Sequence, residues 1–118
     1  MKVMIVEDNR KMRQVIKEII LKRLREVDIV YECGCETAAI AEYQRLHPEW
    51  VLMDIKLESG DGISASQQIL ATDPTAQIVI LTNYDEPYYR DAARQVGVKA
   101  FVMKEDLHEL PGILRNML

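Results

Sequence analysis

Two hydrophobic patterns alternate along this chain. Short, mainly apolar runs are separated by longer stretches in which apolar residues recur every three or four positions. Continuous apolar runs are typical of strands buried on both faces, and the longer spacing is typical of helices with one face toward a core. The sequence therefore predicts five strands, at residues 2–6, 28–32, 50–54, 77–82 and 100–103.

A helix is predicted after each of these strands. Asn9 is a suitable cap for the first helix, whose apolar face consists of Met12, Val15, Ile16, Ile19, Ile20 and Leu24. Pro111 and Gly112 lie close to the start of the last helix and weaken it. The four later helices are expected at 38–46, 62–71, 85–96 and 106–118.

Composition favours one compact domain. The chain has 118 residues, of which 48% are hydrophobic, so residues 1–118 are expected to form one domain around a single core. No apolar run approaches the roughly 20 residues of a membrane span, and the chain starts in a strand rather than a signal peptide. We therefore expect a cytoplasmic protein without membrane contact. The spacing of Cys33 and Cys35 supports neither a zinc site nor a disulfide scaffold.

Basic residues are concentrated in the first helical segment, although the net charge of the chain is -4. This segment is either a solvated helix face or a docking surface for an acidic partner. Direct nucleic-acid binding is not expected, because the rest of the domain is acidic and carries no recognition motif. The basic residues of the segment are Arg10, Lys11, Arg13, Lys17, Lys22, Arg23 and Arg25.

Polar and charged residues follow the predicted strands. A succession of strand–helix units implies a parallel sheet with right-handed crossovers and helices on both faces, and ligands of such sheets bind beyond the carboxyl ends of the strands. One Asp at a strand end is explained by capping of the next loop, but several acids converging near an apolar core need a chemical reason. The residues at these ends are Glu7, Asp8, Asp54, Thr82 and Lys104.

These fragments, in this order and spacing, resemble the receiver domain of bacterial two-component response regulators. The resemblance runs from Lys2 to the last helix, and it implies a flavodoxin-like (βα)5 fold, a doubly wound parallel α/β sheet in strand order 2-1-3-4-5. Each fragment alone is weak evidence, and the resemblance depends on all of them occurring in this order and at this spacing. They are Met4-Ile5-Val6-Glu7-Asp8, Val51-Leu52-Met53-Asp54-Ile55, Asp61-Gly62, Ile80-Leu81-Thr82 and Ala100-Phe101-Val102-Met103-Lys104.

The acids at the strand ends predict a metal-assisted phosphoryl acceptor. Two carboxylates about 4 Å apart repel by about 4 kcal/mol at an effective dielectric of 20, so three together need a cation, and all-oxygen ligands suit Mg²⁺. Asp8 and Asp54 are the expected direct ligands and Glu7 a ligand through water, and the resemblance adds the backbone carbonyl of Lys56. Asp54 can then act as the nucleophile, with Lys104 as a positive charge for phosphoryl oxygens.

The resemblance also implies a signalling role rather than that of a turnover enzyme. The expected phosphoryl donor is a phosphohistidine on a sensor histidine kinase. The hydroxyl of Thr82 and the ring of Phe101 would move on phosphorylation and remodel the surface of the fourth helix, fifth strand and fifth helix. An output domain or effector, such as a helix-turn-helix DNA-binding domain, and a phosphorylation-linked homodimer are the further partners implied.

Some positions depart from the usual pattern of this family. Asn83 stands where a small residue is common, Glu58 where proline is common, and Phe101 where tyrosine is common. Lys56 and Tyr84 are expected beside the phosphoryl group. Two alternatives stay open: a degenerate receiver that binds proteins without being phosphorylated, and a magnesium-dependent phosphotransferase or phosphatase with an aspartyl intermediate. Tyr84, Tyr88 and Tyr89 are either partner anchors or ordinary packing residues.

Overall fold

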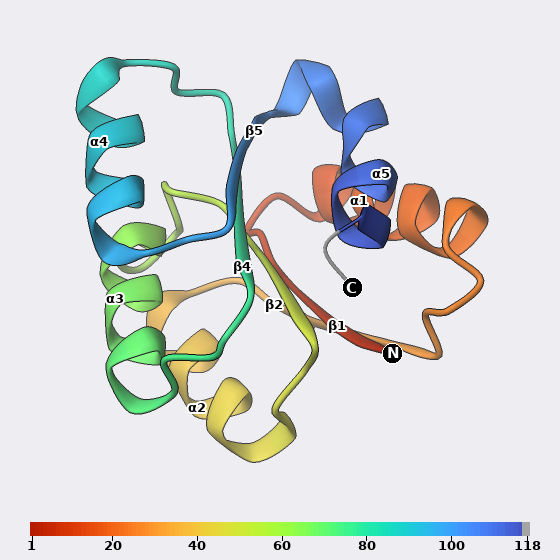
Figure 1. Cartoon of the computed structure of the whole chain (residues 1–118), viewed down its shortest axis with the longest axis horizontal. Coiled ribbons are helices and arrows are strands. Elements are labelled where there is room, and N and C mark those ends of the chain that lie inside the picture. The colour runs from red at the N-terminus through yellow and green to blue at the C-terminus, as the bar shows by residue number, and fades with distance from the viewer. Residues whose placement is uncertain (117–118) are drawn as a thin grey trace.

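A five-stranded parallel sheet forms the centre of the molecule (Figure 1). The computed structural model describes residues 1–116. The strand order is β2-β1-β3-β4-β5, which confirms the predicted fold. The strands are β1 (Lys2–Val6), β2 (Ile29–Cys33), β3 (Trp50–Met53), β4 (Ile78–Thr82) and β5 (Ala100–Met103).

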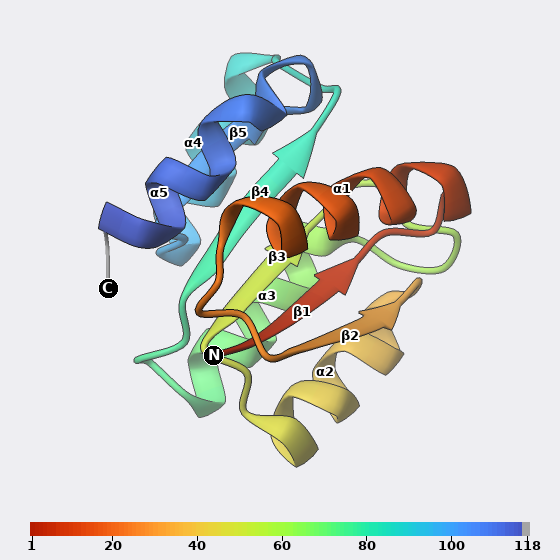
Figure 2. The same ribbon diagram turned by 90° about the vertical axis from the view of Figure 1, so that its right-hand side faces the viewer.

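Helices cover both faces of the sheet, and Figures 1 and 2 show α1 and α5 on one face and α2, α3 and α4 on the other. Within the described residues, none of these helices is long and apolar enough to cross a membrane. The helices are α1 (Arg10–Arg23), α2 (Glu36–Leu46), α3 (Gly62–Thr72), α4 (Pro87–Val96) and α5 (Leu110–Asn116).

Alternation along the strands divides the core into two layers. In β1, Val3 and Ile5 pack toward α1 and α5, whereas Met4 and Val6 pack toward the other three helices. Every residue of β3 and β4 is buried. Because neighbouring strands and both helical layers enclose these strands, their sequences are continuously apolar rather than alternating.

The predicted boundaries were wrong at the second strand and the helix after it. The strand ends at Cys33, one residue later than predicted, and α2 begins at Glu36, two residues earlier. Cys35 has extended backbone dihedrals and caps this helix without a side-chain hydrogen bond. The first turn of α2 therefore carries neither an apolar stripe nor a standard capping residue that would mark its start.

Two predictions on the outer helices also need correction. Val15 was predicted to face the core but is 44% exposed, because about 100° of rotation per residue places it at the rim of the stripe that contains Ile16 and Ile20. The predicted helix at 106–118 is instead a 3₁₀ helix, Lys104–Glu109, followed by α5. Pro111 explains this boundary, since proline is tolerated in the first turn of an α-helix. Residues 117 and 118 of the prediction lie outside the described range.

Gly62 joins the sheet to α3 at a point with no room for a side chain. A Cβ atom at this position would lie 1.8 Å from the carbonyl oxygen of Asp54.

We expect Gly62→Ala to lower the free energy of unfolding by about 3 kcal/mol, measured by urea denaturation. Gly112→Ala is the matched control, because a Cβ there meets no atom within 4 Å. It should stabilise the protein by up to about 1 kcal/mol. Equal stabilities of the two variants would contradict this account.

Candidate functional site

Sequence-predicted site residues meet at the carboxyl edge of the sheet. A cavity of about 440 Å³ lies there, and Glu7, Asp8, Asp54 and Lys104 all line it. The fifth residue, Thr82, is fully buried at the end of β4. The parallel strand order brings these residues together, because β1, β3 and β4 are consecutive neighbours that end at the same edge.

The three acids form a compact group. Glu7, Asp8 and Asp54 each place a carboxylate oxygen within 4.8 Å of the other two. Glu7 and Asp54 are only 1% and 6% exposed, whereas Asp8 is exposed. Backbone hydrogen bonds fix the buried pair: the Glu7 N–H donates to the Cys33 carbonyl and the Asp54 N–H to the Val6 carbonyl, each at 3.0 Å. The acids thus extend the hydrogen-bond ladder of the sheet.

Lys104 is held between the two buried acids. Its Nζ atom donates a hydrogen bond to Asp54 Oδ2 at 2.8 Å and lies 2.6 Å from Glu7 Oε1. Asp54 Oδ1 accepts a hydrogen bond from the N–H of Ile55 at 2.8 Å. The sequence predicted Lys104 at the same site as Asp54, as a charge for phosphoryl oxygens, but it missed the contact with Glu7. The available signal was strand alternation, which places Glu7 in step with the buried Ile5.

Burial and pairing shift the pKa values in this group. Burial raises the pKa of Glu7, against the opposing effect of its hydrogen bonds with Lys104 and with the N–H of Asn9. Burial alone would lower the pKa of Lys104, but its contacts with Asp54 and Glu7 outweigh this and raise it. Lys104 is therefore a stable ammonium at neutral pH, and its positive charge balances the negative charge of the buried carboxylates.

The donor set fits a hard divalent cation. Three carboxylates supply only oxygen atoms, and a lysine ammonium already lies between two of them, which shows that this edge attracts positive charge. Asp8 adds an exposed carboxylate at the cavity. The Lys56 carbonyl oxygen accepts no backbone hydrogen bond from residues 1–116 and is free to act as a fourth ligand. Oxygen ligands that leave open positions match Mg²⁺ better than zinc or copper.

The two predicted switch residues lie on neighbouring strands behind the acids. The Thr82 hydroxyl oxygen accepts a hydrogen bond from the N–H of Tyr84 at 3.2 Å. Phe101 is half-buried, and the Arg90 guanidinium carbon lies 4.6 Å from the centre of its ring. Arg90 also donates a hydrogen bond to Asp85 at 2.6 Å. Each switch residue is thus in contact with a residue at or near the start of α4.

One residue that departs from the family pattern and the two residues expected beside the phosphoryl group lie at the cavity. Asn83, Tyr84 and Lys56 line it. The Lys56 ammonium lies 4.9 Å from the ring centre of Tyr84 and 5.9 Å from that of Tyr89, within the range of cation–π attraction. Tyr88 is 75% exposed. At least two of the three tyrosines are therefore engaged in intramolecular contacts, while Tyr88 is the most accessible.

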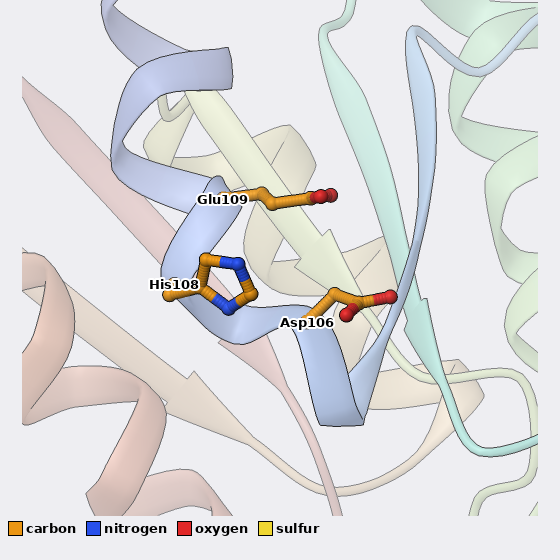
Figure 3. Close-up of side chains that lie close together, drawn as sticks. All are labelled: Asp106, His108 and Glu109. Carbon is orange, nitrogen blue, oxygen red and sulfur yellow. The ribbon is translucent and has the colours of Figure 1, made fainter.

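A second group of possible metal ligands lies on the 3₁₀ helix (Figure 3). Asp106, His108 and Glu109 have ligand atoms within 4.8 Å of one another. His108 and Glu109 are exposed. Residues two and three positions apart lie close together in a 3₁₀ helix because its turns are tight. The proximity of these three side chains therefore does not indicate a dedicated metal site.

Sequence comparisons identify relatives over most of the chain. Residues 3–115 match the family model of the response regulator receiver domain. The chemotaxis protein CheY of Thermotoga maritima is 34% identical over 103 residues, which cover 87% of this chain and 84% of CheY. The response regulator protein VraR of Staphylococcus aureus is 31% identical over 105 residues, which cover 87% of this chain but 49% of VraR.

Solved structures of response regulators share the fold of this chain. A LuxR-family DNA-binding response regulator from Staphylococcus aureus superposes with a TM-score of 0.90 at 22% identity, covering 98% of this chain and 96% of that one. A LuxR-family two-component response regulator from Aurantimonas sp. SI85-9A1 gives 0.90 at 26% identity, covering 98% and 83%. The Mn²⁺-bound response regulator Rcp1 gives 0.78 at 21% identity, covering 93% and 88%. The family match over residues 3–115 and the 34% identity with CheY establish that the chain belongs to the response regulator receiver domain family.

Proposed function

We propose that Asp54 accepts a phosphoryl group from a phosphohistidine of a sensor histidine kinase. The observation that carries this proposal is the placement of Asp54 at a cavity, with Lys104 Nζ 2.8 Å from its Oδ2 atom. A carboxylate oxygen of Asp54 forms the new P–O bond while the P–N bond of the donor breaks. The imidazole leaves with the electron pair of that bond and takes up a proton from solvent.

Bound Mg²⁺ would be held by Asp8, Asp54 and the Lys56 carbonyl, with Glu7 acting through water. It would neutralise charge on the phosphoryl oxygens. Lys104 contributes in the same direction. Once Asp54 becomes an acyl phosphate, its carboxylate charge is lost, and the lysine ammonium pairs with a phosphoryl oxygen instead. We propose self-catalysed phosphotransfer and dephosphorylation as the only chemistry of this domain, without turnover of a separate substrate.

Phosphorylation is proposed to change the surface formed by α4, β5 and α5. Rotation of the Thr82 hydroxyl toward a phosphoryl group on Asp54 would break its hydrogen bond with the N–H of Tyr84. Inward movement of Phe101 would remove the ring from beneath Arg90. Both movements change contacts at the start of α4. The added charge at Asp54 would thereby shift the surface of α4, β5 and α5 from one arrangement to another.

The proposed output is control of transcription in the cytoplasm. This chain spans about half the length of VraR, and several of the structural neighbours are described as LuxR-family or DNA-binding regulators. These relationships support an output domain of the helix-turn-helix type or a separate effector as the partner of the switched surface. DNA contact is then a task of the output domain rather than of the receiver.

Incubation with acetyl phosphate and Mg²⁺ should add one phosphoryl group to the wild-type protein, measured as intact mass. Asp54→Ala should remove the adduct because the acceptor oxygen is lost. Asp91→Ala, which alters an exposed acid on α4, should leave it unchanged. Failure of the wild type to form an adduct with a broad panel of donors and kinases would favour a receiver that binds partners without phosphorylation.

Lys104→Met removes the cation but keeps an unbranched side chain. We expect the free energy of unfolding at pH 7 to fall by about 3 kcal/mol, because two buried carboxylates lose their partner. Burial raises the pKa of Glu7 and Lys104 lowers it, so loss of the ammonium raises this pKa further. As the pH falls, the folded variant therefore gains more stability from protonation of Glu7 than the wild type does. The deficit should therefore shrink toward pH 5.

Urea unfolding of this variant at the two pH values tests the expectation, with Lys99→Met as the control. Lys99 is exposed and precedes β5, so its replacement should change the free energy of unfolding little at either pH. A Lys104→Met protein as stable as the wild type at pH 7 would show that the ammonium is not needed to compensate the buried acids.

Phosphorylation should also promote self-association through α1 or the surface of α4, β5 and α5. Sedimentation velocity should then show a monomer before treatment with acetyl phosphate and a dimer after it. Asp54→Ala should stay monomeric under both conditions. Observation of only monomer for a fully phosphorylated wild-type sample would count against this part of the proposal.

A further inference from the structure

Glu36 connects the start of α2 to the loop that follows Asp54. Its Oε1 atom accepts a hydrogen bond from the backbone N–H of Asp61 at 2.9 Å. Its Oε2 atom accepts hydrogen bonds from Ser64 Oγ at 2.7 Å and from Gln68 Nε2 at 3.0 Å. The backbone N–H of Glu36 donates to the Ser59 carbonyl at 3.0 Å. One residue thus binds both the loop and the first turns of α3.

The loop is fitted closely to this side chain. At Gly60, φ is +96°, and an added Cβ atom would lie 2.3 Å from the Cβ atom of Glu36. Within residues 1–116, no lysine or arginine lies at ion-pair distance from the Glu36 carboxylate. Neutral donors and the N-terminal end of α3 hold the negative charge instead. The hydrogen bonds from Asp61, Ser64 and Gln68 to this carboxylate form only while the loop and the start of α3 keep their present path.

The same loop carries the carbonyl of Lys56. Its base is closed by the hydrogen bond from the Gly62 N–H to the Ile55 carbonyl at 2.7 Å and by a bridge between Lys56 and Asp61. Asp61 is therefore in contact with Lys56 on one side and with Glu36 on the other. Proline, which would stiffen such a loop, is replaced by Glu58. Contacts from outside the loop therefore provide the restraint.

We propose that Glu36 is a positioning residue for the magnesium site. By fixing Asp61 and the loop tip, it restrains the segment that carries the Lys56 carbonyl, which would hold the ion together with Asp8 and Asp54. This inference rests on the proposed function, because it assigns a cause to the arrangement of one proposed ligand. The Glu36 carboxylate accepts hydrogen bonds from Asp61, Ser64 and Gln68, so its loss acts on the loop and the first turns of α3 rather than directly on Asp8, Asp54 or Lys104. Contacts that orient metal ligands typically account for about 10–100-fold in metal affinity.

Magnesium titration of three variants tests this role. Isothermal titration calorimetry should give a Kd for Mg²⁺ about tenfold higher in Glu36→Ala than in the wild type. Glu36→Gln keeps one acceptor for the Asp61 N–H and should show a smaller rise. Glu42→Ala is the matched control: Glu42 lies on the same helix but pairs with Arg45, and among residues 1–116 it forms no hydrogen bond or ion pair with the loop. Its Kd should equal that of the wild type.

The magnesium dependence of phosphorylation gives a second readout. With acetyl phosphate as donor, Glu36→Ala should need about tenfold more Mg²⁺ for half-maximal rate. Its rate at saturating Mg²⁺ should approach that of the wild type, because Asp54 and Lys104 are intact. A purely structural role would instead lower the unfolding midpoint in EDTA and leave both the Kd and the half-maximal concentration unchanged.

The outcomes separate this inference from the proposed function. If wild-type protein binds Mg²⁺ and is phosphorylated on Asp54, but both Glu36 variants bind Mg²⁺ as the wild type does, the positioning role is wrong and the proposed function stands. If the wild type neither binds Mg²⁺ nor forms the adduct, the proposed function itself fails. Should Glu36→Ala not fold, the Kd of Glu36→Gln decides: a value equal to that of the wild type overturns the inference.

Discussion

A single ammonium makes two buried carboxylates tolerable at the carboxyl edge of the sheet. Lys104 follows β5, whereas its partners follow β1 and β3, so its side chain must reach across the end of β4. The observed strand order allows that reach, and Thr82, the last residue of β4, is fully buried. Pairing one ammonium with two poorly solvated carboxylates therefore depends on three features together. These are the strand order, the residue at the end of β4 and the length of the lysine side chain.

The sequence predicted most of the fold because the strands at its centre are enclosed on every side. Runs such as Val51-Leu52-Met53 are apolar throughout, and no solvent-exposed position interrupts them. Strand order, in contrast, came from the resemblance to receiver domains, since periodicity alone does not say which strands are neighbours. A TM-score of 0.90 at 22% identity shows that this architecture is compatible with different residues at most positions.

The candidate site was predictable where a residue directly follows a strand, and not where it depends on loop conformation. Asp54 and Lys104 could be placed because a strand end fixes both direction and neighbourhood. The hydrogen bonds of Glu36 join residues 25 to 32 positions apart through side-chain and loop atoms, so no local sequence pattern predicts them. Val15 shows a related limit: a residue at the rim of a helical stripe satisfies the apolar spacing whether or not it is covered.

Lys56 combines two contributions that come from different parts of the residue. Its carbonyl is the proposed metal ligand, while its ammonium lies over the rings of Tyr84 and Tyr89. Every amino acid supplies the same carbonyl oxygen, so a substitution at position 56 leaves that ligand chemically unchanged and alters only the wall of the cavity. Variation at this position can therefore change the surroundings of Asp54 without removing the carbonyl that is proposed to hold the ion.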